Sequence, residues 1–170
     1  MPSNAPESSG KVEIGFGLGS NIGDKPANIR KALDLIESRN VARLKAVSSI
    51  YRTPPWGYRE QEDFANACAL AETFLTPEAL LAAVKAIEAD MGRQETVRWG
   101  PRLIDIDILF YGDKPLATKD LVLPHKELFN RAFVLVPLAE IAPHLKLGGR
   151  SIAEAAAQTQ EPIEKWIASP

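Results

Sequence analysis

One segment of the chain alternates so regularly that a strand with two different faces is the natural expectation. Residues 64–73 read FANACALAET, with alanine at every second position. Successive side chains of a strand point to opposite faces of its sheet. We therefore expect four alanines on one face and Phe64, Asn66, Cys68 and Leu70 on the other.

Two helices are expected on either side of this strand in the sequence. Asp24 and Pro26 begin the first, because proline suits a first turn whose N–H groups lack helical partners. Thr76 and Pro77 begin the second, and Gly92 ends it. Apolar residues recur at helical spacing along both, at Ile29, Leu33 and Ile36 and at Leu80, Val84, Ile87 and Met91.

The elements follow one another in the order β-α-β-β-α-β, with strands expected at residues 12–16, 41–53, 64–73 and 103–111. This order is typical of a ferredoxin-like α+β sandwich. From about Leu121 we expect C-terminal additions: irregular structure, further strands and a small helix at residues 152–158. The glycine-rich residues 17–23 are expected to form a tight turn, since their spacing fits neither a P-loop nor a Rossmann motif.

Composition favours one globular domain over residues 11–170, after a polar tail at residues 1–10 that we expect to be disordered. The 170 residues are 45% hydrophobic and 25% charged, with a net charge of -2. Such a charge gives no footprint for nucleic acid or an anionic membrane. No apolar stretch approaches membrane-spanning length and no signal peptide is evident, so we expect a cytoplasmic monomer.

The strand at residues 103–111 carries the sharpest chemical feature, Asp105 and Asp107. Strand period places both carboxylates on one face and Ile104, Ile106 and Ile108 on the other. Two such carboxylates repel each other unless a cation or a proton lies between them. Oxygen ligands of this kind suit Mg²⁺, which is usually held by one or two carboxylates together with substrate phosphates. Taken alone, the pair also fits an amphipathic edge strand with solvated acids.

Three arginines, Arg93, Arg98 and Arg102, lie just upstream, among Trp99, Gly100 and Pro101. A guanidinium group forms paired, charge-assisted hydrogen bonds to phosphate oxygens. A solvated charged loop is the alternative for this segment alone. Acids that hold a metal beside arginines that hold phosphate are the groups that phosphoryl transfer needs, so the two features together predict a nucleotide site.

A second set of residues suits a flat heteroaromatic ring. Phe64 offers a stacking surface beside Asn66, whose amide can donate and accept hydrogen bonds at once. The rigid segment from Thr53 to Gly57, which contains Pro54 and Trp56, can add backbone groups. The alternative is that Phe64 belongs to the core and Asn66 to a turn.

A third group, His125, Arg131 and Phe133, can contact phosphate and ring. The alternative is that His125 caps a helix and Phe133 packs in the core, while His144 is expected to be structural.

These clusters, taken in order, resemble the 6-hydroxymethyl-7,8-dihydropterin pyrophosphokinases of folate biosynthesis. The resemblance covers residues 14–143. The segments that carry it are Gly17-Leu-Gly-Ser-Asn-Ile-Gly, Ser49-Ile-Tyr-Arg-Thr-Pro-Pro, Asp63-Phe-Ala-Asn-Ala, Ile87-Glu-Ala-Asp-Met-Gly-Arg, Arg98-Trp-Gly-Pro-Arg-Leu-Ile-Asp-Ile-Asp-Ile-Leu, Leu123-Pro-His and Asn130-Arg-Ala-Phe-Val-Leu-Val-Pro-Leu-Ala-Glu-Ile-Ala-Pro.

The resemblance implies transfer of pyrophosphate from Mg-ATP to the hydroxymethyl group of the dihydropterin, with release of AMP. Its small-molecule substrates are then ATP and the pterin, and two Mg²⁺ ions are implied at Asp105 and Asp107. By position, the resemblance implies the catalytic group Arg93, Arg102, Asp105 and Asp107. It implies an ATP side with Glu88, Arg93, Trp99, Arg102, Ile108, His125 and Arg131. It implies a pterin side with Thr53, Pro54, Trp56, Phe64, Asn66 and Phe133.

Two other classes of function remain as alternatives from the residues themselves. A non-catalytic ferredoxin-like module that binds a small ligand would tolerate loss of both aspartates. An RNA-binding ferredoxin-like domain would need exposed aromatic residues on its central strands, where this chain has alanines. The chain departs from some members of the family at residues 94–97, which lack an extra basic residue, and at Asp120, where some have arginine.

Overall fold

The protein is a mixed α/β structure built on one antiparallel sheet. The computed structural model describes residues 10–54, 62–92 and 103–166. The disordered tail expected at residues 1–10 therefore lies outside the described residues, apart from Gly10. The described sheet contains six strands: β1 (Val12–Ser20), β2 (Arg43–Val47), β3 (Tyr51–Thr53), β4 (Phe64–Thr73), β5 (Asp105–Tyr111) and β10 (Glu164–Lys165).

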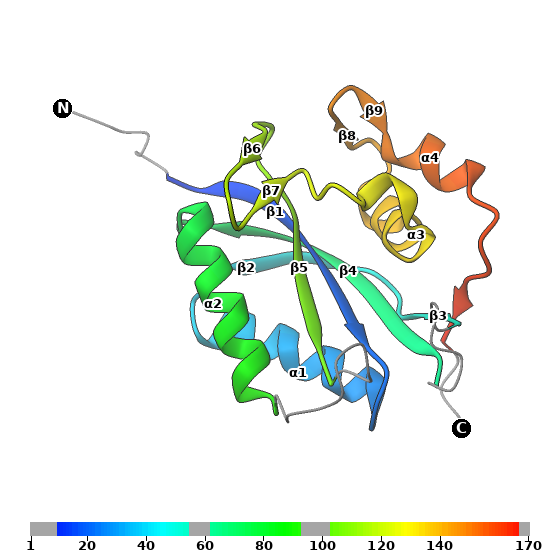
Figure 1. Ribbon diagram of the computed structural model, residues 1–170, viewed down its shortest axis with the longest axis horizontal. Helices are drawn as coiled ribbons and strands as arrows, with labels where there is room; N and C mark the ends of the chain where they lie inside the picture. Colours follow the sequence, from blue (N-terminus) through cyan, green and yellow to red (C-terminus); the bar gives the residue numbers. More distant parts are fainter. Residues whose placement is uncertain (1–9, 55–61, 93–102, 167–170) are drawn as a thin grey trace.

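The strands run in the spatial order β10-β3-β4-β1-β5, and β2 pairs with the far end of β4. Every pair is antiparallel, so β4 lies between β1 on one side and both β3 and β2 on the other. Figure 1 shows β5 as the last of the described strands at one edge and β3 near the other. This order places β1 between β4, which carries Phe64 and Asn66, and β5, which carries Asp105 and Asp107.

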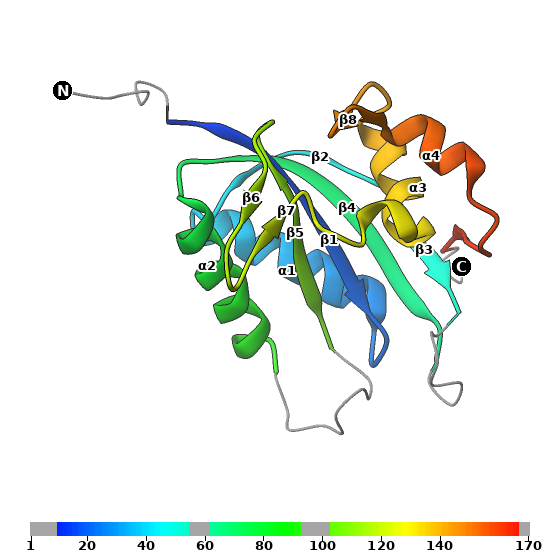
Figure 2. The ribbon, with the colours of Figure 1, turned by 45° about the horizontal axis from the view of Figure 1, so that its top comes forward.

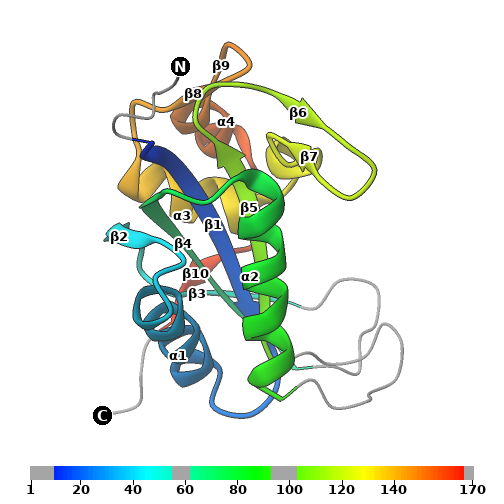
Figure 3. The same cartoon turned by 90° about the vertical axis from the view of Figure 1, so that its left-hand side faces the viewer.

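Helices cover both faces of the sheet. On one face lie α1 (Lys25–Ser38) and α2 (Pro77–Asp90), and on the other lies α3 (Ala132–Ile141) (Figure 1, Figure 3). Figure 2 shows α4 (Ile152–Gln158) lying against α3, on its side away from the sheet. Short hairpins complete the fold: β6 (Leu116–Ala117) with β7 (Val122–Leu123), and β8 (Lys146–Leu147) with β9 (Arg150–Ser151).

Both long helices begin where the sequence predicts. Asp24 caps α1 by accepting the Ala27 N–H at 3.2 Å, and Thr76 caps α2 by accepting the Ala79 N–H at 3.2 Å. Such caps satisfy one of the N–H groups that the first helical turn leaves without a partner. No helix among the described residues is long and apolar enough to cross a lipid bilayer.

The alternation of β4 divides the interior into two apolar clusters. The four alanines of β4 pack with the predicted apolar stripes of α1 and α2, and both predictions are confirmed. Cys68, on the opposite face, packs with α3 through Val134, Leu135 and Leu138. The sheet is therefore buried on both sides near its centre, and the small alanine side chains lie under the two long helices.

The turn expected at residues 17–23 is wrong for its first half, because β1 continues to Ser20. Gly15, Gly17 and Gly19 lie in the strand on the face toward α3, where neighbouring side chains occupy the space that a Cβ would need. Phe110 covers Gly15, Leu109 covers Gly17, and the Asn66 amide lies over Gly19. Glycine here permits close approach of side chains to the strand rather than a turn. The turn itself is confined to residues 21–24.

Two further expectations need correction. The strand expected at residues 41–53 is two strands, β2 and β3, and the strand expected from Leu103 begins at Asp105. Helix α3 was not predicted, because its sequence AFVLVPLAEI is apolar on nearly every side and contains Pro137. An apolar stripe is absent when a helix is buried on several sides. Here α3 lies between the sheet and α4. The small helix at residues 152–158 is confirmed.

Gly15→Ala should destabilise the protein by about 1–3 kcal/mol, the usual cost of an extra methyl in a packed core. A Cβ at Gly15 would overlap the buried ring of Phe110, so the ring would have to shift. Gly17→Ala is the matched control, because its Cβ would lie 3.3 Å from the end of the Leu109 side chain. Urea unfolding measures both variants. Equal free energies of unfolding for the two would contradict this account of the β1 glycines.

Candidate active site

The register of the sheet places residues from four strands in one row near one end of these strands. Tyr51 pairs with Asn66, Asn66 with Gly19, and Gly19 with Asp105. In the adjacent row Gly17 lies between Cys68 and Asp107. Neighbouring strands are about 4.8 Å apart, so Asn66 and Asp105 are roughly 10 Å apart across the glycine strand. The ring-binding and acidic candidates thus share one face, with no side chain of β1 between them.

The two aspartates lie on the face predicted for them. Ile106 and Ile108 are buried in the cluster under α1 and α2, whereas Asp105 and Asp107 are half-buried on the opposite face. A register shift opposite Gly15 and Phe16 then turns both Leu109 and Phe110 toward α3, so the strict alternation ends there. The period-two prediction is confirmed at the acidic pair.

Arg131 links the acidic pair to α3. Its Nη1 lies 3.9 Å from Oδ2 of Asp107, and its guanidinium lies 5.5 Å from the centroid of the Phe133 ring. Arg131 is the N-cap residue of α3 and Phe133 is in its first turn. The structure therefore brings a carboxylate of β5 together with a cation and an aromatic ring that lie 24 and 26 residues further along the sequence.

His125 is also part of this group. Its Nδ1 accepts the N–H of Glu127 at 3.1 Å, and the main-chain N–H of His125 donates to the carbonyl of Leu109 at 2.8 Å. Because Nδ1 is an acceptor, the neutral ring carries its proton on Nε2. Burial lowers the pKa of His125 and Arg131 acts in the same direction, while Asp107 and Glu127 oppose them. His125 thus helps to form the turn before the 3-10 helix Leu128–Asn130 and keeps Nε2–H as a donor. The N-cap of that helix is Glu127 and no side chain caps it, so the alternative that His125 caps a helix is wrong here.

Glu88 reaches the same strand from α2. Its Oε2 accepts the N–H of Ile106 at 2.7 Å. Since β5 is the last of the described strands at its edge, this carboxylate satisfies an N–H that none of those strands pairs with. Burial raises the pKa of Glu88, and Asp105 and Asp107 raise it further, against the Ile106 hydrogen bond and Lys85. Glu88 therefore lies close to the acidic pair, at the outer edge of the sheet.

The ring-binding candidates Asn66, Thr53 and Phe64 lie next to one another. The Asn66 Nδ2 donates to the Thr53 hydroxyl at 2.8 Å, and both side chains are buried. Phe64 pairs with Thr53 across the two strands and is half-buried. A Cβ at Gly19 would lie 3.0 Å from Oδ1 of Asn66. The hydrogen bond to the Thr53 hydroxyl therefore orients the Asn66 amide, and the missing side chain at Gly19 leaves room for its Oδ1.

Four predicted site residues lie outside the described residues: Trp56, Arg93, Trp99 and Arg102. The neighbouring Arg98 lies outside them as well. Pro54 is exposed at the end of β3. The side chain of Ile108 is buried under α1 and α2, so only its main chain is available to a nucleotide.

Sequence reasoning missed a link between α3 and β3 through Glu140. The Tyr51 hydroxyl donates to Glu140 at 2.6 Å, and Ser49 donates its N–H at 3.1 Å and its hydroxyl at 3.0 Å. Burial raises the pKa of Glu140, but the hydrogen bonds from Tyr51 and Ser49 outweigh it and hold the pKa below its ordinary value. Tyr51 lies two residues before Thr53, so this link sets how α3, with Phe133, lies over β3. No local pattern indicates partners 89 and 91 residues apart.

The acidic pair fits a metal that is shared with a substrate. Among the described residues no group of three His, Cys, Asp or Glu side chains is arranged to hold a metal ion. Two carboxylates with oxygen donors suit Mg²⁺, which keeps several waters and binds substrate phosphates rather than a complete protein cage. Asp105 and Asp107 are the described residues that fit this role.

Paired carboxylates with an arginine and a histidine beside them are typical of enzymes that act on phosphate groups. Comparison with known proteins identifies the family. The model of the 7,8-dihydro-6-hydroxymethylpterin-pyrophosphokinase family matches residues 15–143. This match includes every candidate site residue named above.

Proteins of known name give the same answer. A 2-amino-4-hydroxy-6-hydroxymethyldihydropteridine pyrophosphokinase from Methylorubrum extorquens is 50% identical over 143 residues, which are 84% of this chain and 90% of that protein. The enzyme of the same name from Bacillus subtilis is 40% identical over 149 residues, 88% of this chain and 87% of that protein. The chain belongs to the 7,8-dihydro-6-hydroxymethylpterin-pyrophosphokinase family.

Solved structures support the fold. A crystal structure of wild-type Plasmodium falciparum HPPK-DHPS with pteroate matches with a TM-score of 0.71 at 16% identity, over 87% of this chain. An HPPK-DHPS in complex with substrates matches with a TM-score of 0.69 at 18% identity, over 86% of this chain. This chain spans less than half the length of those two proteins, 42% and 43%.

Glu140→Gln should reduce the loss of unfolding free energy that the protein shows when the pH falls from 7 to 3. The pKa of Glu140 is lower in the folded protein than its ordinary 4.5, so the ionised carboxylate stabilises the fold above pH 4.5. That contribution is lost as the pH falls below 4.5 and through the folded pKa. We expect Glu140→Gln to be less stable than the parent at pH 7 and to lose less on acidification. Urea unfolding between pH 7 and pH 3 measures this.

The matched control is Glu154→Gln, at an exposed glutamate of α4. It should keep the acid dependence of the parent. An unchanged acid slope in Glu140→Gln would show that the link between α3 and β3 does not depend on the charge of Glu140.

Proposed function

We infer that this chain is a 6-hydroxymethyl-7,8-dihydropterin pyrophosphokinase of folate biosynthesis. It transfers the terminal diphosphate of ATP to the hydroxymethyl group of the dihydropterin and releases AMP. Family membership carries the identity of the reaction. The row from Asn66 through Gly19 to Asp105 is the structural observation that best supports it.

The row accounts for how two substrates can meet on one surface. We assign the ring of the pterin to the Asn66 end, where the fixed amide presents Oδ1 beside the half-buried face of Phe64. Phe133, on α3, forms the second aromatic wall. We assign the triphosphate of ATP to the Asp105 and Asp107 end. β1 adds no side chain of its own between the two ends, because Gly19 and Gly17 make room for the Asn66 amide and for Leu109.

Charge neutralisation and positioning are the main tasks in this reaction, because phosphoryl transfer needs little covalent help from the protein. Arg131, which lies 3.9 Å from Asp107, and the Nε2–H of His125 would bind phosphate oxygens of the nucleotide. Mg²⁺ held by Asp105 and Asp107 would supply charge neutralisation and activation of the attacking hydroxyl. Glu88 would keep the outer edge of β5 in place beside them.

Several finer assignments belong to the same proposal. Two Mg²⁺ ions are assigned to the acidic pair, because the family resemblance implies two. The strand order β5-β1-β4-β3 and the two helices on one face support a ferredoxin-like core. Arg93, Arg102, Trp99, Trp56, Pro54 and the main chain of Ile108 keep the roles that the family resemblance implies. We further propose that residues 11–170 act as one domain and as a monomer on small-molecule substrates.

Incubation with Mg-ATP and the reduced hydroxymethyl pterin should produce AMP only when the pterin is present. Liquid chromatography of the nucleotides measures this directly. Formation of ADP would identify an ordinary kinase, and no turnover with both substrates would show that the inferred reaction is wrong.

Asp107→Asn should slow AMP formation by about 100-fold or more, a usual cost of losing one charge-stabilising group in an active site. The matched control is Asp113→Asn, at an exposed aspartate just after the end of β5, and it should keep the parent rate.

Asn66→Ala should raise the KM for the pterin by roughly tenfold and leave the KM for ATP within about twofold, since one lost pair of hydrogen bonds costs ~1–2 kcal/mol. Thr53→Val tests the same assignment from the other side, because it removes only the hydroxyl that orients the amide. We expect a smaller increase in the pterin KM. Steady-state kinetics with each substrate varied in turn gives both values. Equal increases for the two substrates would place Asn66 elsewhere.

A further inference from the structure

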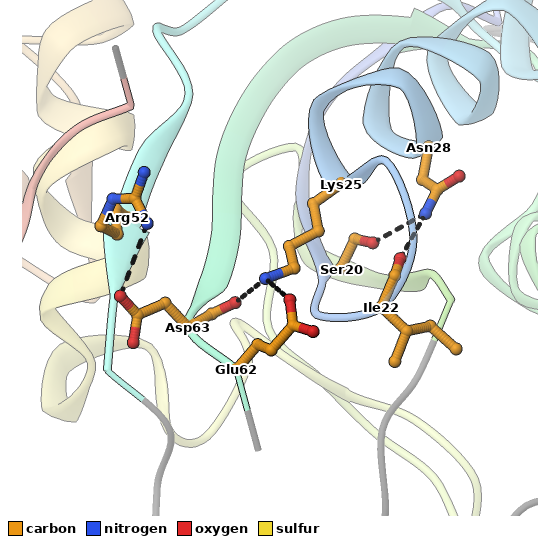
Figure 4. A network of polar contacts seen from close by, with 7 residues as sticks. All are labelled: Ser20, Ile22, Lys25, Asn28, Arg52, Glu62 and Asp63. Atoms are coloured by element: carbon orange, nitrogen blue, oxygen red, sulfur yellow. Dashed lines mark hydrogen bonds and ion pairs between the residues drawn. The ribbon is translucent and has the colours of Figure 1, made fainter. Parts of the chain in front are cut away.

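Lys25, the first residue of α1, is buried although it carries a charge. Only 6% of its surface is exposed. Lysine is rarely buried this far unless its ammonium group is paired. Its Nζ donates to the carbonyl of Asp63 at 2.9 Å and lies 2.7 Å from Oε1 of Glu62 (Figure 4). Both acceptors belong to the two residues that directly precede Phe64.

Lys25 is itself held in a fixed place. Asn28, one turn further along α1, donates from Nδ2 to the Ser20 hydroxyl at 3.1 Å and to the carbonyl of Ile22 at 2.9 Å (Figure 4). These bonds fasten the start of α1 to the end of β1. The ammonium group of Lys25 therefore ties the entry of β4 to a rigid neighbour.

Arg52 holds the same entry from the opposite side. Its Nη1 lies 3.6 Å from Oδ2 of Asp63, as Figure 4 shows. Its guanidinium lies 4.0 Å from the centroid of the Trp166 ring, and the ammonium of Lys25 lies 5.6 Å from that centroid. Cations over an indole face are attracted by its quadrupole. Trp166 thus lies close to both cations that contact residues 62 and 63.

The C-terminal segment brings Trp166 to this position. The Trp166 N–H donates to the carbonyl of Ile50 at 2.7 Å, and β10 pairs with β3 at Tyr51 and Arg52. Further back, Glu161 accepts the N–H of Ala132 at 3.0 Å, at the start of α3. Residues 161–166 therefore contact both β3, which carries Thr53, and the helix that carries Phe133.

We propose that Lys25 and Trp166 are positioning residues for the pterin ring. They fix residues 62–63 and β3 beneath the site, and so set where Phe64, Asn66 and Thr53 meet the ring. The proposal rests on the pterin pyrophosphokinase activity inferred above. Neither residue is assigned a contact with substrate, so both act through the strands they hold.

The stability of the fold alone does not explain why position 25 is a buried lysine. Glu62 is 75% exposed, and ion pairs with an exposed partner contribute little. Burying an ammonium group is unfavourable, and an apolar side chain of similar volume is often at least as stable. The contact that distinguishes Lys25 is the bond to the Asp63 carbonyl, one residue before the strand that carries the ring-binding side chains.

The arrangement also predicts which substrate is affected. Lys25, Arg52 and Trp166 contact β3 and the start of β4, two strands away from β5. Arg131 and His125 instead contact Asp107 and Glu127, on the β5 side of the site. Loss of the positioning contacts should therefore weaken the use of pterin and leave the use of ATP nearly unchanged.

The test compares Lys25→Met and Trp166→Ala with the parent full-length chain in the pterin-dependent AMP assay. Small displacements of substrate-binding groups have large kinetic effects, so we expect the pterin KM to rise about tenfold in each variant. The KM for ATP should stay within about twofold. Trp166→Phe keeps an aromatic face for Arg52 and should restore most of the parent value. Thermal unfolding of every variant verifies that the chain is folded.

Lys45→Met is the matched control, at a lysine of β2 that pairs with Glu72 away from these residues. It should keep the parent KM for both substrates. If Lys25→Met does not fold, the pterin KM values of Trp166→Ala and Trp166→Phe decide whether the positioning role holds. An unchanged pterin KM, or an equal rise for ATP, would overturn the positioning role while the parent activity stands. A parent that forms no AMP would instead overturn the inferred function.

Discussion

The pairing of β5 with β1 is the constraint on which the site depends. It places Asp107 beside Gly17 and Asp105 beside Gly19, on the face opposite α1 and α2. The glycines matter because the space above them is already taken by Leu109, Phe110 and the Asn66 amide. Any side chain on this face of β1 would displace one of these neighbours. The middle strand therefore contributes no side chain of its own between the two halves of the site.

That separation suits a reaction between two bound substrates. The amide and hydroxyl at one end of the row are matched to a flat ring with a mixed hydrogen-bonding edge. The carboxylates at the other end, with Arg131 and His125, are matched to a metal and phosphates. Side chains from different parts of the chain fix the position of each half. Glu88 holds the acidic strand, while Glu140 and Lys25 hold the strands of the ring-binding half.

The sequence predicted those features that depend on the spacing of residues within a single strand or helix. The two faces of β4, the stripes and caps of α1 and α2, and the common face of Asp105 and Asp107 all follow from spacings of two or three to four residues. The glycine-rich end of β1 looked like a turn because glycine is favoured both in turns and where side chains approach a strand. Helix α3 has no visible stripe because it is covered on several sides. The roles of Glu140 and Lys25 depend on partners 37 to 91 residues away, which no local spacing reveals.

The binding of Mn²⁺, a spectroscopic substitute for Mg²⁺, tests most directly whether the acidic face is the metal–nucleotide site. Electron paramagnetic resonance should show Mn²⁺ bound to the parent protein in the presence of α,β-methylene-ATP. The folded double variant Asp105→Asn with Asp107→Asn should lose that signal. The same nucleotide-dependent binding in the double variant would place the metal elsewhere and contradict the account of β5 as the surface that holds the phosphates.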